Sequence, residues 1–359
     1  RTSSAMSTSR ECLDYSTLRI DWLNLGLIYS ALCIMDKTFV KERALMSEEK
    51  YNRHPIMEGL ELGLGTWAWG DRLFWGYGQG YGSEDTRQAF DASIAAGVRF
   101  FDTAEVYGQG QSELILGKLL KTTDQPLRVA TKFMPFPWQL SRRVLLRHLR
   151  ASLKRLDLWK VSLYQMHFPN PPVSVETWME AMAEAVHNGL TEAVGVSNYD
   201  RSQMQRAFDT LARQGISLAS NQVEYHLLDR RIETSGMLQQ CRELGVTVIA
   251  YSPLAQGMLT GKYTAENPPR GFRAGKYTRK TLAAIKPLVD TLKKIGSDHA
   301  GKTAAQVALN WTICKGTVPI PGAKNLAQAE QNAGAMGWRL TDEEVARLDE
   351  LSERVTKAD

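Results

Sequence analysis

The stretch "EDTRQAFDASIAAGVRFFDTAEVYG" (residues 84–108) decides the fold of this chain. In residues 84–96 the apolar side chains recur every three or four positions, which predicts an amphipathic helix. The apolar run "VRFFDT" (98–103) that follows predicts a buried strand. The same alternation continues from residue 60 onward, and regular alternation of strands and helices predicts a parallel sheet covered by helices.

Eight strands are predicted, at residues 60–67, 98–103, 127–133, 161–167, 191–197, 218–225, 246–252 and 316–322. Helices are predicted between them, at residues 84–96, 112–121, 141–156, 175–188, 201–213, 235–244 and 280–314, the last in two pieces. Eight such units close naturally into a barrel, so we expect an α/β protein of the (β/α)8 TIM-barrel class. A doubly wound open sheet is the alternative.

The chain of 359 residues has a formal net charge of +5, and its length suits one large barrel. No run of basic residues indicates nucleic-acid binding, and the apolar run at 23–35 is too short to span a bilayer. The cysteines have no metal-binding spacing. We therefore expect no nucleic acid, no membrane and no metal as partners.

The first residues differ in composition from the rest of the chain. We interpret residues 1–45 as an N-terminal extension, disordered or not part of the native domain, and residues 46–359 as the barrel domain. We expect a cytoplasmic protein. The Ser/Thr-rich, Arg-containing start faintly resembles a transit peptide, so the plastid stroma is the alternative location.

One motif, "GSDHAGKT" (296–303), matches the phosphate-loop pattern, but a helical pattern precedes it where that loop needs a strand. We interpret the match as a coincidence in a turn between helices, and a nucleotide hydrolase using Lys302 is the weakest hypothesis. No strand is followed by G-x-G-x-x-G, so a dinucleotide would not bind in the Rossmann manner.

Four polar residues stand at or just after the ends of three consecutive predicted strands: Asp102, Tyr107, Lys132 and His167. Functional residues gather at this end of such barrels. Singly, each has an ordinary explanation as a turn cap, a surface charge or a structural side chain. Together they suggest proton donation to a carbonyl oxygen while a hydride reaches the carbon. Tyrosine has a pKa of about 10, and a nearby lysine would lower it.

The chain resembles the aldo-keto reductase family over about residues 58–355, in the branch of plant and bacterial pyridoxal reductase-like proteins and potassium-channel β subunits. The family's catalytic tetrad matches Asp102, Tyr107, Lys132 and His167 in order. The resemblance implies NADPH/NADP+ as the cofactor and a small aldehyde or ketone as the substrate. It predicts reduction to the alcohol with Tyr107 as general acid. The alternative is an NADP(H)-binding regulatory or redox-sensor module with slow turnover.

The resemblance also implies which residues bind the cofactor. The nicotinamide carboxamide would contact Ser197, Asn198 and Gln222, and Tyr251 would stack on its ring. The pyrophosphate path would be lined by Ser252, Pro253, Leu254, Gln256, Gly257 and Lys262. The segment 319–332 resembles the one that grips the adenosine 2′-phosphate, with Gly322, Lys324, Gln328, Gln331 and Asn332. The end of the first strand would contribute Gly65, Thr66 and Trp67.

Lys324 lies where a strand opens onto a helix, and a helix N-terminus favours anions. Gln328 and Gln331 stand where many family members have an arginine and a glutamate, so strict exclusion of NADH is an open question. Trp67, Trp69 and Trp75, with Tyr77, are candidates for the wall of an apolar or aromatic aldehyde pocket. The alternative is that Trp69 and Trp75 pack their loop against the barrel.

Overall fold

The computed structural model describes residues 53–271 and 273–356, and the predicted extension at 1–45 lies outside them. Within the described part, one sheet contains eight parallel strands in chain order, each paired with the next. They are β1 (Leu64–Gly65), β2 (Phe100–Asp102), β3 (Arg128–Phe133), β4 (Val161–Met166), β5 (Thr191–Ser197), β6 (Leu218–Glu224), β7 (Thr247–Tyr251) and β8 (Val318–Pro319).

The first and last strands close the sheet on itself. The N–H groups of Gly63 and Gly65 donate to the carbonyl oxygens of Pro319 (3.0 Å) and Pro321 (3.1 Å). A Cβ atom on Gly65 would lie 2.9 Å from the Ile320 carbonyl oxygen, so this close approach requires glycine. The (β/α)8 barrel is confirmed, and the doubly wound sheet is excluded.

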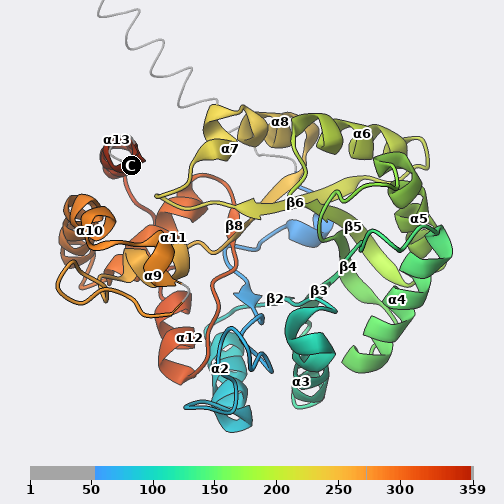
Figure 1. Ribbon diagram of the computed structural model, residues 1–359, viewed down its shortest axis with the longest axis horizontal. Helices are drawn as coiled ribbons and strands as arrows, with labels where there is room; N and C mark the ends of the chain where they lie inside the picture. Colours follow the sequence, from blue (N-terminus) through green and yellow to red (C-terminus); the bar gives the residue numbers. More distant parts are fainter. Residues whose placement is uncertain (1–52, 272, 357–359) are drawn as a thin grey trace, which may run out of the picture. The chain divides into compact units, whose positions relative to one another are not determined.

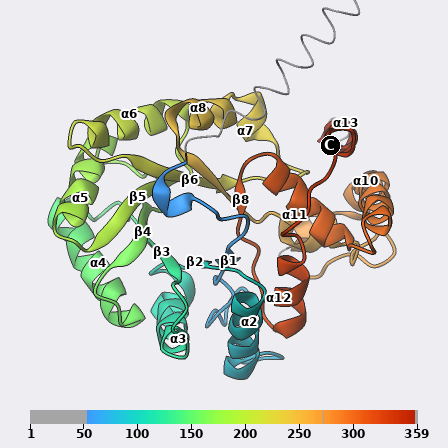
Figure 2. The same cartoon turned by 180° about the vertical axis from the view of Figure 1, so that it is seen from behind.

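Helices surround the sheet, as the two opposite views of Figures 1 and 2 show. They are α2 (Ser83–Ala95), α3 (Gln111–Leu120), α4 (Arg142–Leu156), α5 (Val175–His187), α6 (Arg201–Ala212), α7 (Arg231–Thr234), α8 (Met237–Leu244), α9 (Arg273–Lys276), α10 (Arg279–Asp298), α11 (Ala304–Cys314), α12 (Leu326–Ala333) and α13 (Asp342–Thr356). Short 3-10 helices are η1 (Pro55–Met57), η2 (Tyr107–Gly110) and η3 (Ala255–Thr260). Of the helices described, none has both the length and the apolar character needed to cross a bilayer.

Most predicted strands and helices lie within a few residues of their observed positions. β1 is shorter than predicted, because regular pairing is confined to the point where it meets its two neighbours. α13 lies beyond the last predicted element. Gly296 lies within α10, and α11 begins just after the turn that follows it, so the phosphate-loop match is a turn between two helices, as expected.

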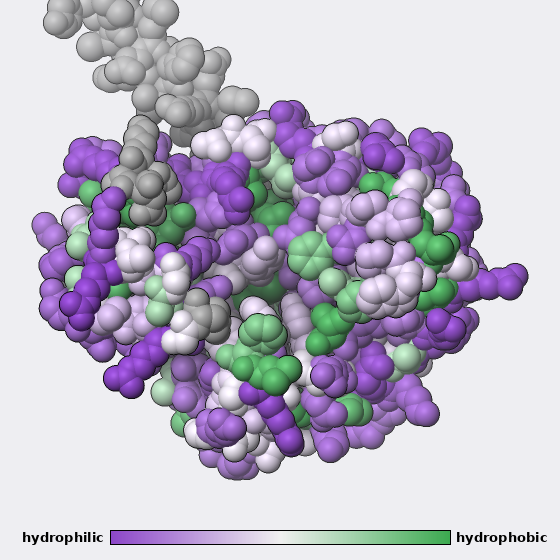
Figure 3. All heavy atoms as spheres, viewed as in Figure 1, coloured by the Kyte–Doolittle hydropathy of each residue, from purple (hydrophilic) through white to green (hydrophobic). Residues whose placement is uncertain are grey.

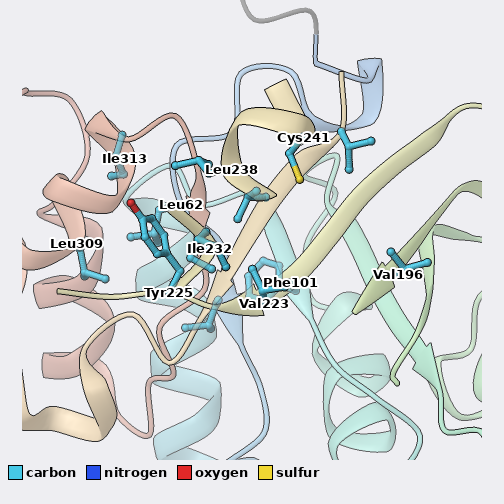
Figure 4. Close-up of a cluster of buried hydrophobic side chains, with 14 of the residues drawn as sticks. Leu62, Phe101, Val196, Val223, Tyr225, Ile232, Leu238, Cys241, Leu309 and Ile313 are labelled. Carbon is cyan, nitrogen blue, oxygen red and sulfur yellow. The ribbon is translucent and has the colours of Figure 1, made fainter. Parts of the chain in front are cut away.

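The apolar core has two layers. A large outer layer lies between strands and helices, and Figure 4 shows part of it, with labelled side chains from β2, β5, β6, α7, α8 and α11. A smaller layer fills the barrel near the amino ends of the strands, where Met57 packs with Ala130 and Leu163. Two residues further along the same strands the interior becomes polar, at Lys132 and Gln165. Alternation along a strand places these pairs on one face, so the carboxyl end of the barrel carries the chemistry.

Candidate active site

A buried ion pair lies at the centre of the site. Asp102 ends β2, and Lys132 lies near the end of β3. Their side chains are 2% and 0% exposed, and Lys132 Nζ pairs with Asp102 Oδ1. The Lys132 ammonium also donates to the Thr103 carbonyl oxygen at 2.8 Å. Burial acts to lower the pKa of Lys132, but its interactions with the Asp102 carboxylate and the Tyr107 hydroxyl outweigh burial, and the pKa is raised.

Tyr107 begins η2, in the loop after β2. Lys132 Nζ donates to Tyr107 Oη at 3.3 Å. This loop passes close to the loop after β1. A Cβ atom on Gly108 would lie 2.8 Å from the backbone of Gly70, so the position requires glycine. Burial raises the pKa of Tyr107, and this outweighs the lowering by Lys132. The predicted lowering of the Tyr107 pKa is therefore wrong, because the sequence does not show how strongly the phenol is desolvated. Tyr107 stays protonated at neutral pH.

His167 directly follows β4, and its ring centroid lies 5.8 Å from that of Tyr107. Burial and then the Lys132 charge lower the pKa of His167 to about 3. Its Nδ1 atom is buried without a hydrogen-bond partner among residues 53–271 and 273–356. His167 is therefore a neutral imidazole, which can donate or accept one hydrogen bond through its ring nitrogens. The four predicted tetrad residues are brought together.

Two glutamines hold the other oxygen of the Asp102 carboxylate. Gln222 Nε2 donates to Asp102 Oδ2 at 2.8 Å, and Gln165 Nε2 donates to the same oxygen at 3.2 Å. Sequence analysis missed Gln165 because an amide carries no charge. The available signal was its position in "YQMH", two residues before His167 and thus on the same face of the strand.

The predicted carboxamide and ring contacts form one hydrogen-bonded group at the ends of β5, β6 and β7. Ser197 Oγ donates to the Gln222 carbonyl oxygen at 2.8 Å. Asn198 has a positive φ of 60°, and its Nδ2 atom donates to the His167 carbonyl oxygen at 3.1 Å. Tyr251 Oη donates to Asn198 Oδ1 at 3.0 Å. These residues lie beside the tetrad, and their contacts with a nicotinamide remain a prediction.

The residues after β1 take different positions. Thr66 is buried, and its Oγ1 atom donates to the Asp102 carbonyl oxygen at 3.0 Å. Trp67 is 38% exposed and stacks on Tyr107, with 6.0 Å between ring centroids. Trp69 is 0% exposed and donates through Nε1 to the Ala323 carbonyl oxygen at 2.8 Å. It therefore packs the loop against the barrel, the alternative given for it, and does not line a substrate pocket. Trp75 meets the Trp67 ring edge-on at 5.4 Å.

The predicted pyrophosphate path follows β7 in a tight turn that leads into η3. Several of its residues have a positive φ: Ser252 (51°), Ala255 (49°), Gln256 (55°) and Gly257 (97°). Of the remaining predicted residues of this path, Pro253 and Leu254 lie in the same turn, and Lys262 follows η3. Within this turn the N–H groups of Ala255 and Gly257 donate to the carbonyl oxygens of Ser252 (2.8 Å) and Leu254 (2.9 Å).

The residues predicted to bind the 2′-phosphate lie in and around α12. Lys324 Nζ donates to the Trp75 carbonyl oxygen at 3.0 Å. Gln328 Oε1 accepts from the Lys324 backbone N–H at 2.9 Å, and Asn332 Nδ2 donates to the Gly322 carbonyl oxygen at 3.1 Å. Gln331 differs, because it reaches toward α11 and donates to Thr303 Oγ1 at 3.3 Å.

Arg273, which sequence analysis missed, adds a cation to this end of the site. It donates to the Gln256 carbonyl oxygen at 3.3 Å and to Tyr263 Oη at 3.1 Å. Burial, and then the charges of Arg273 and Lys262, lower the pKa of Lys324. Positive charges gathered in this way fit an anionic ligand such as the phosphates of a dinucleotide. Nothing in the sequence around Arg273 marked it, since it lies outside every recognisable motif.

The barrel brings a carboxylate, an ammonium, a phenol and an imidazole together at the carboxyl ends of its strands, where barrel enzymes have their active sites. A model of the Aldo/keto reductase family matches residues 61–353. The chain belongs to this family and is an oxidoreductase.

Two relatives show the extent of the similarity. Pyridoxal reductase, chloroplastic, of Arabidopsis thaliana is 39% identical over 310 residues, which cover 83% of this chain and 84% of the relative. An uncharacterized oxidoreductase of Mycobacterium tuberculosis is 42% identical over 287 residues, which cover 78% of this chain and 85% of the relative.

Two solved structures share the fold. A thermostable aldo-keto reductase in complex with the inhibitor epalrestat is 33% identical, covers 81% of this chain and 94% of its own, and has a TM-score of 0.65. An aldo/keto reductase from Klebsiella pneumoniae in complex with NADP and acetate is 29% identical, covers 81% of this chain and 90% of its own, and has a TM-score of 0.63.

Proposed function

We propose that this protein reduces aldehydes or ketones to alcohols with NADPH, and that Tyr107 is the general acid. The observation that carries the proposal is the chain of contacts from Asp102 through Lys132 to Tyr107, which ends with 3.3 Å between Nζ and Oη. A protonated phenol beside a buried ammonium can give up its proton to a developing alkoxide, because the positive charge stabilises the phenolate left behind.

The chemistry requires one donor of hydride and one of proton. When bound, the reduced nicotinamide supplies the hydride to the carbonyl carbon. Tyr107 Oη gives its proton to the carbonyl oxygen as that oxygen takes up the electron pair of the broken π bond. His167, held neutral, donates a hydrogen bond to the same oxygen, and Lys132 stabilises the phenolate. Tyr107 then regains a proton from water, so the carbonyl is reduced and the cofactor is oxidised.

The site's donors fit NADPH. Ser197, Asn198 and Gln222 would hold the carboxamide, and Tyr251 would lie against the nicotinamide ring. The unpartnered Nδ1 atom of His167, among the described residues, indicates that this part of the site is built for a ligand. Lys324, Arg273 and Lys262 would face the phosphates. Relatives of known structure have been crystallised with NADP and with NADPH.

The substrate we propose is an apolar or aromatic carbonyl compound. Exposed apolar side chains lie in the loops that follow β1, β3 and β4: Trp67, Leu73, Phe74, Trp138, Leu140 and Phe168. Figure 3 shows hydrophobic side chains gathered around a hollow near the middle of the face seen in Figure 1. Such a rim favours flat, poorly hydrated ligands. Pyridoxal is the first compound to test, because the Arabidopsis relative is named a pyridoxal reductase.

The proposal is tested by following the absorbance of NADPH with pyridoxal, benzaldehyde and short aliphatic aldehydes as substrates. We expect turnover of at least one aromatic aldehyde at about 1 s⁻¹ or faster, the ordinary lower range for enzymes. Tight NADPH binding with turnover far below that on every carbonyl would contradict the proposal and favour the regulatory module.

The cytoplasmic location also stays a proposal, with the plastid stroma as its alternative. The Arabidopsis relative is named chloroplastic. A fluorescent fusion of the full chain, expressed in plant cells, distinguishes the two, since a stromal protein would coincide with chlorophyll fluorescence.

A further inference from the structure

The two oxygens of the Asp102 carboxylate have different partners. Oδ1 is paired with Lys132, whereas Oδ2 accepts two amide donors, from Gln222 at 2.8 Å and Gln165 at 3.2 Å. All four side chains are buried, so neither amide can be replaced by bulk water without a rearrangement. A buried carboxylate depends on such donors for its orientation and for its charge.

Gln222 has two competing tasks. It donates to Asp102 in this structure, and the proposed function also gives it the nicotinamide carboxamide as a partner. The Nε2 atom of Gln222, with two donor hydrogens in one plane, already donates to Asp102 Oδ2 at 2.8 Å and to Gln165 Oε1 at 3.5 Å. If the Gln222 amide turned toward a bound carboxamide, its 2.8 Å contact with Asp102 would be weakened or lost.

Gln165 has no such second task. It pairs in register with Lys132 across β3 and β4, which fixes its backbone beside the ion pair. Its Oε1 atom accepts from Ser220 Oγ at 3.4 Å and from Gln222 Nε2 at 3.5 Å. These contacts leave its Nε2 atom directed at the Asp102 carboxylate.

We propose that Gln165 is a positioning residue, which holds the Asp102 carboxylate in place while Gln222 is engaged with the cofactor. The proposal rests on the proposed function and extends it to a residue that touches neither cofactor nor substrate. Gln165 acts through Asp102 on Lys132, and through Lys132 on the proton of Tyr107.

The expected consequence of losing Gln165 follows from electrostatics. With fewer donors, Asp102 attracts the Lys132 ammonium more strongly and draws it away from Tyr107 Oη. The charged groups facing Tyr107 are Lys132 and Asp102, and His167 beside them is neutral. A more distant ammonium makes Tyr107 a weaker acid.

The test is the variant Gln165→Met in the full chain, which keeps the side chain's length and removes both donors. We expect kcat for NADPH-dependent benzaldehyde reduction to fall by about tenfold, the equivalent of one pKa unit. Oxidation of benzyl alcohol with NADP+ needs the phenolate, so its rise with pH should shift upward by about one unit. The dissociation constant of NADPH, measured by tryptophan fluorescence, should stay within about threefold.

A double-variant cycle separates positioning from packing. In an Asp102→Asn background, Gln165→Met should change kcat by less than about twofold. Gln165 acts through the charge of the Asp102 carboxylate, and this background lacks that charge. Asn221→Leu is the matched control. It removes a buried amide on the opposite face of β6, where Nδ2 donates to the Tyr199 carbonyl oxygen at 3.0 Å. It should lower the melting temperature without moving the pH profile.

Two outcomes would overturn the inference: an unchanged kcat and pH profile in Gln165→Met, or equal losses in the native and Asp102→Asn backgrounds. The proposed function fails in a different way, namely if Tyr107→Phe keeps its activity. An inactive Tyr107→Phe with an unaffected Gln165→Met therefore contradicts only the role of Gln165.

Discussion

The tetrad and the region around Lys324 differ in how their charges are balanced. At the tetrad, Asp102 and Lys132 neutralise one another and are almost fully buried. At the other end, the phosphate end, Lys324 lies near Arg273 and Lys262, and burial and then these two like charges lower the pKa of Lys324. The charges of Asp102 and Lys132 are balanced within the protein, whereas we propose that an anion balances those at the phosphate end. Changes at the tetrad should therefore affect folding and chemistry together, and changes at the phosphate end should affect only affinity.

The largest effect is expected for Lys132→Met. It leaves the Asp102 carboxylate buried without its counter-ion, which costs about 3–5 kcal/mol of unfolding free energy. We expect kcat to fall by about 10³-fold, in the range typical for losing an acid–base group. Thermal unfolding and steady-state kinetics measure the two effects.

The control for Lys132→Met is the double variant Asp102→Asn/Lys132→Met, which removes both charges. We expect it to recover most of the stability and none of the activity. If Lys132→Met were inactive yet as stable as the native protein, the description of a self-neutralised tetrad would be contradicted.

A tenfold effect is expected at the phosphate end, for Lys324→Ala. A hydrogen bond to a charged group is worth about 1.5–3 kcal/mol, so the dissociation constant of NADPH should rise about tenfold or more. That of NADH should change little, because NADH lacks the 2′-phosphate. Stability should also change little, because the described residues show no salt bridge between Lys324 and a buried carboxylate.

Lys302→Ala is the matched control for Lys324→Ala. Lys302 belongs to the turn between α10 and α11, and its removal should leave both cofactor affinities unchanged. Equal losses of NADPH and NADH binding in Lys324→Ala would show that this residue does not recognise the 2′-phosphate.

A smaller effect on kcat is expected when the pH is changed. Tyr107 works in its protonated form, and burial raises its pKa above the ordinary value, so reduction should slow only on the alkaline side. The pKa of His167 is lowered to about 3, so His167 stays neutral across the usual range. We expect kcat for reduction to stay level between about pH 5 and pH 9. An inflection near pH 6.5, the ordinary value for histidine, would contradict the neutral state of His167.

The smallest effect is expected from deleting residues 1–45. The family match begins at residue 61, and none of the site residues precedes Gly65. The shortened chain should keep its kcat and its NADPH affinity within about twofold, well under the 1.4 kcal/mol of a tenfold change. Loss of cofactor binding would show that the segment belongs to the site.

Much of the barrel could be predicted because each strand is a short apolar run and each helix has a regular period. The period alone does not say where the eight units stop. α13 has its own apolar spacing, at Val345, Leu348, Leu351 and Val355, yet it follows the last strand and falls outside the repeating pattern. The length of β1 could not be predicted, because it depends on how closely β8 approaches Gly65.

The grouping of the four tetrad residues could be predicted because they stand at the ends of three consecutive strands, and those ends meet at one face of a barrel. Residues that act without a distinctive motif were missed. Gln165 is uncharged, and Arg273 lies in a segment without a recognisable pattern. The direction of the Tyr107 pKa shift could not be predicted either, since it depends on the balance between desolvation and one ammonium, which only the folded structure sets.

The most direct test of the central claim compares kcat for aldehyde reduction in Tyr107→Phe and His167→Gln. Tyr107→Phe removes one oxygen and keeps the ring that stacks on Trp67. If Tyr107 is the proton donor, kcat falls by about 10²-fold at least, in the range for a lost general acid. NADPH affinity should stay within about threefold of the native value. If Tyr107→Phe keeps most of its activity while His167→Gln loses it, His167 is the donor and Tyr107 is not the general acid.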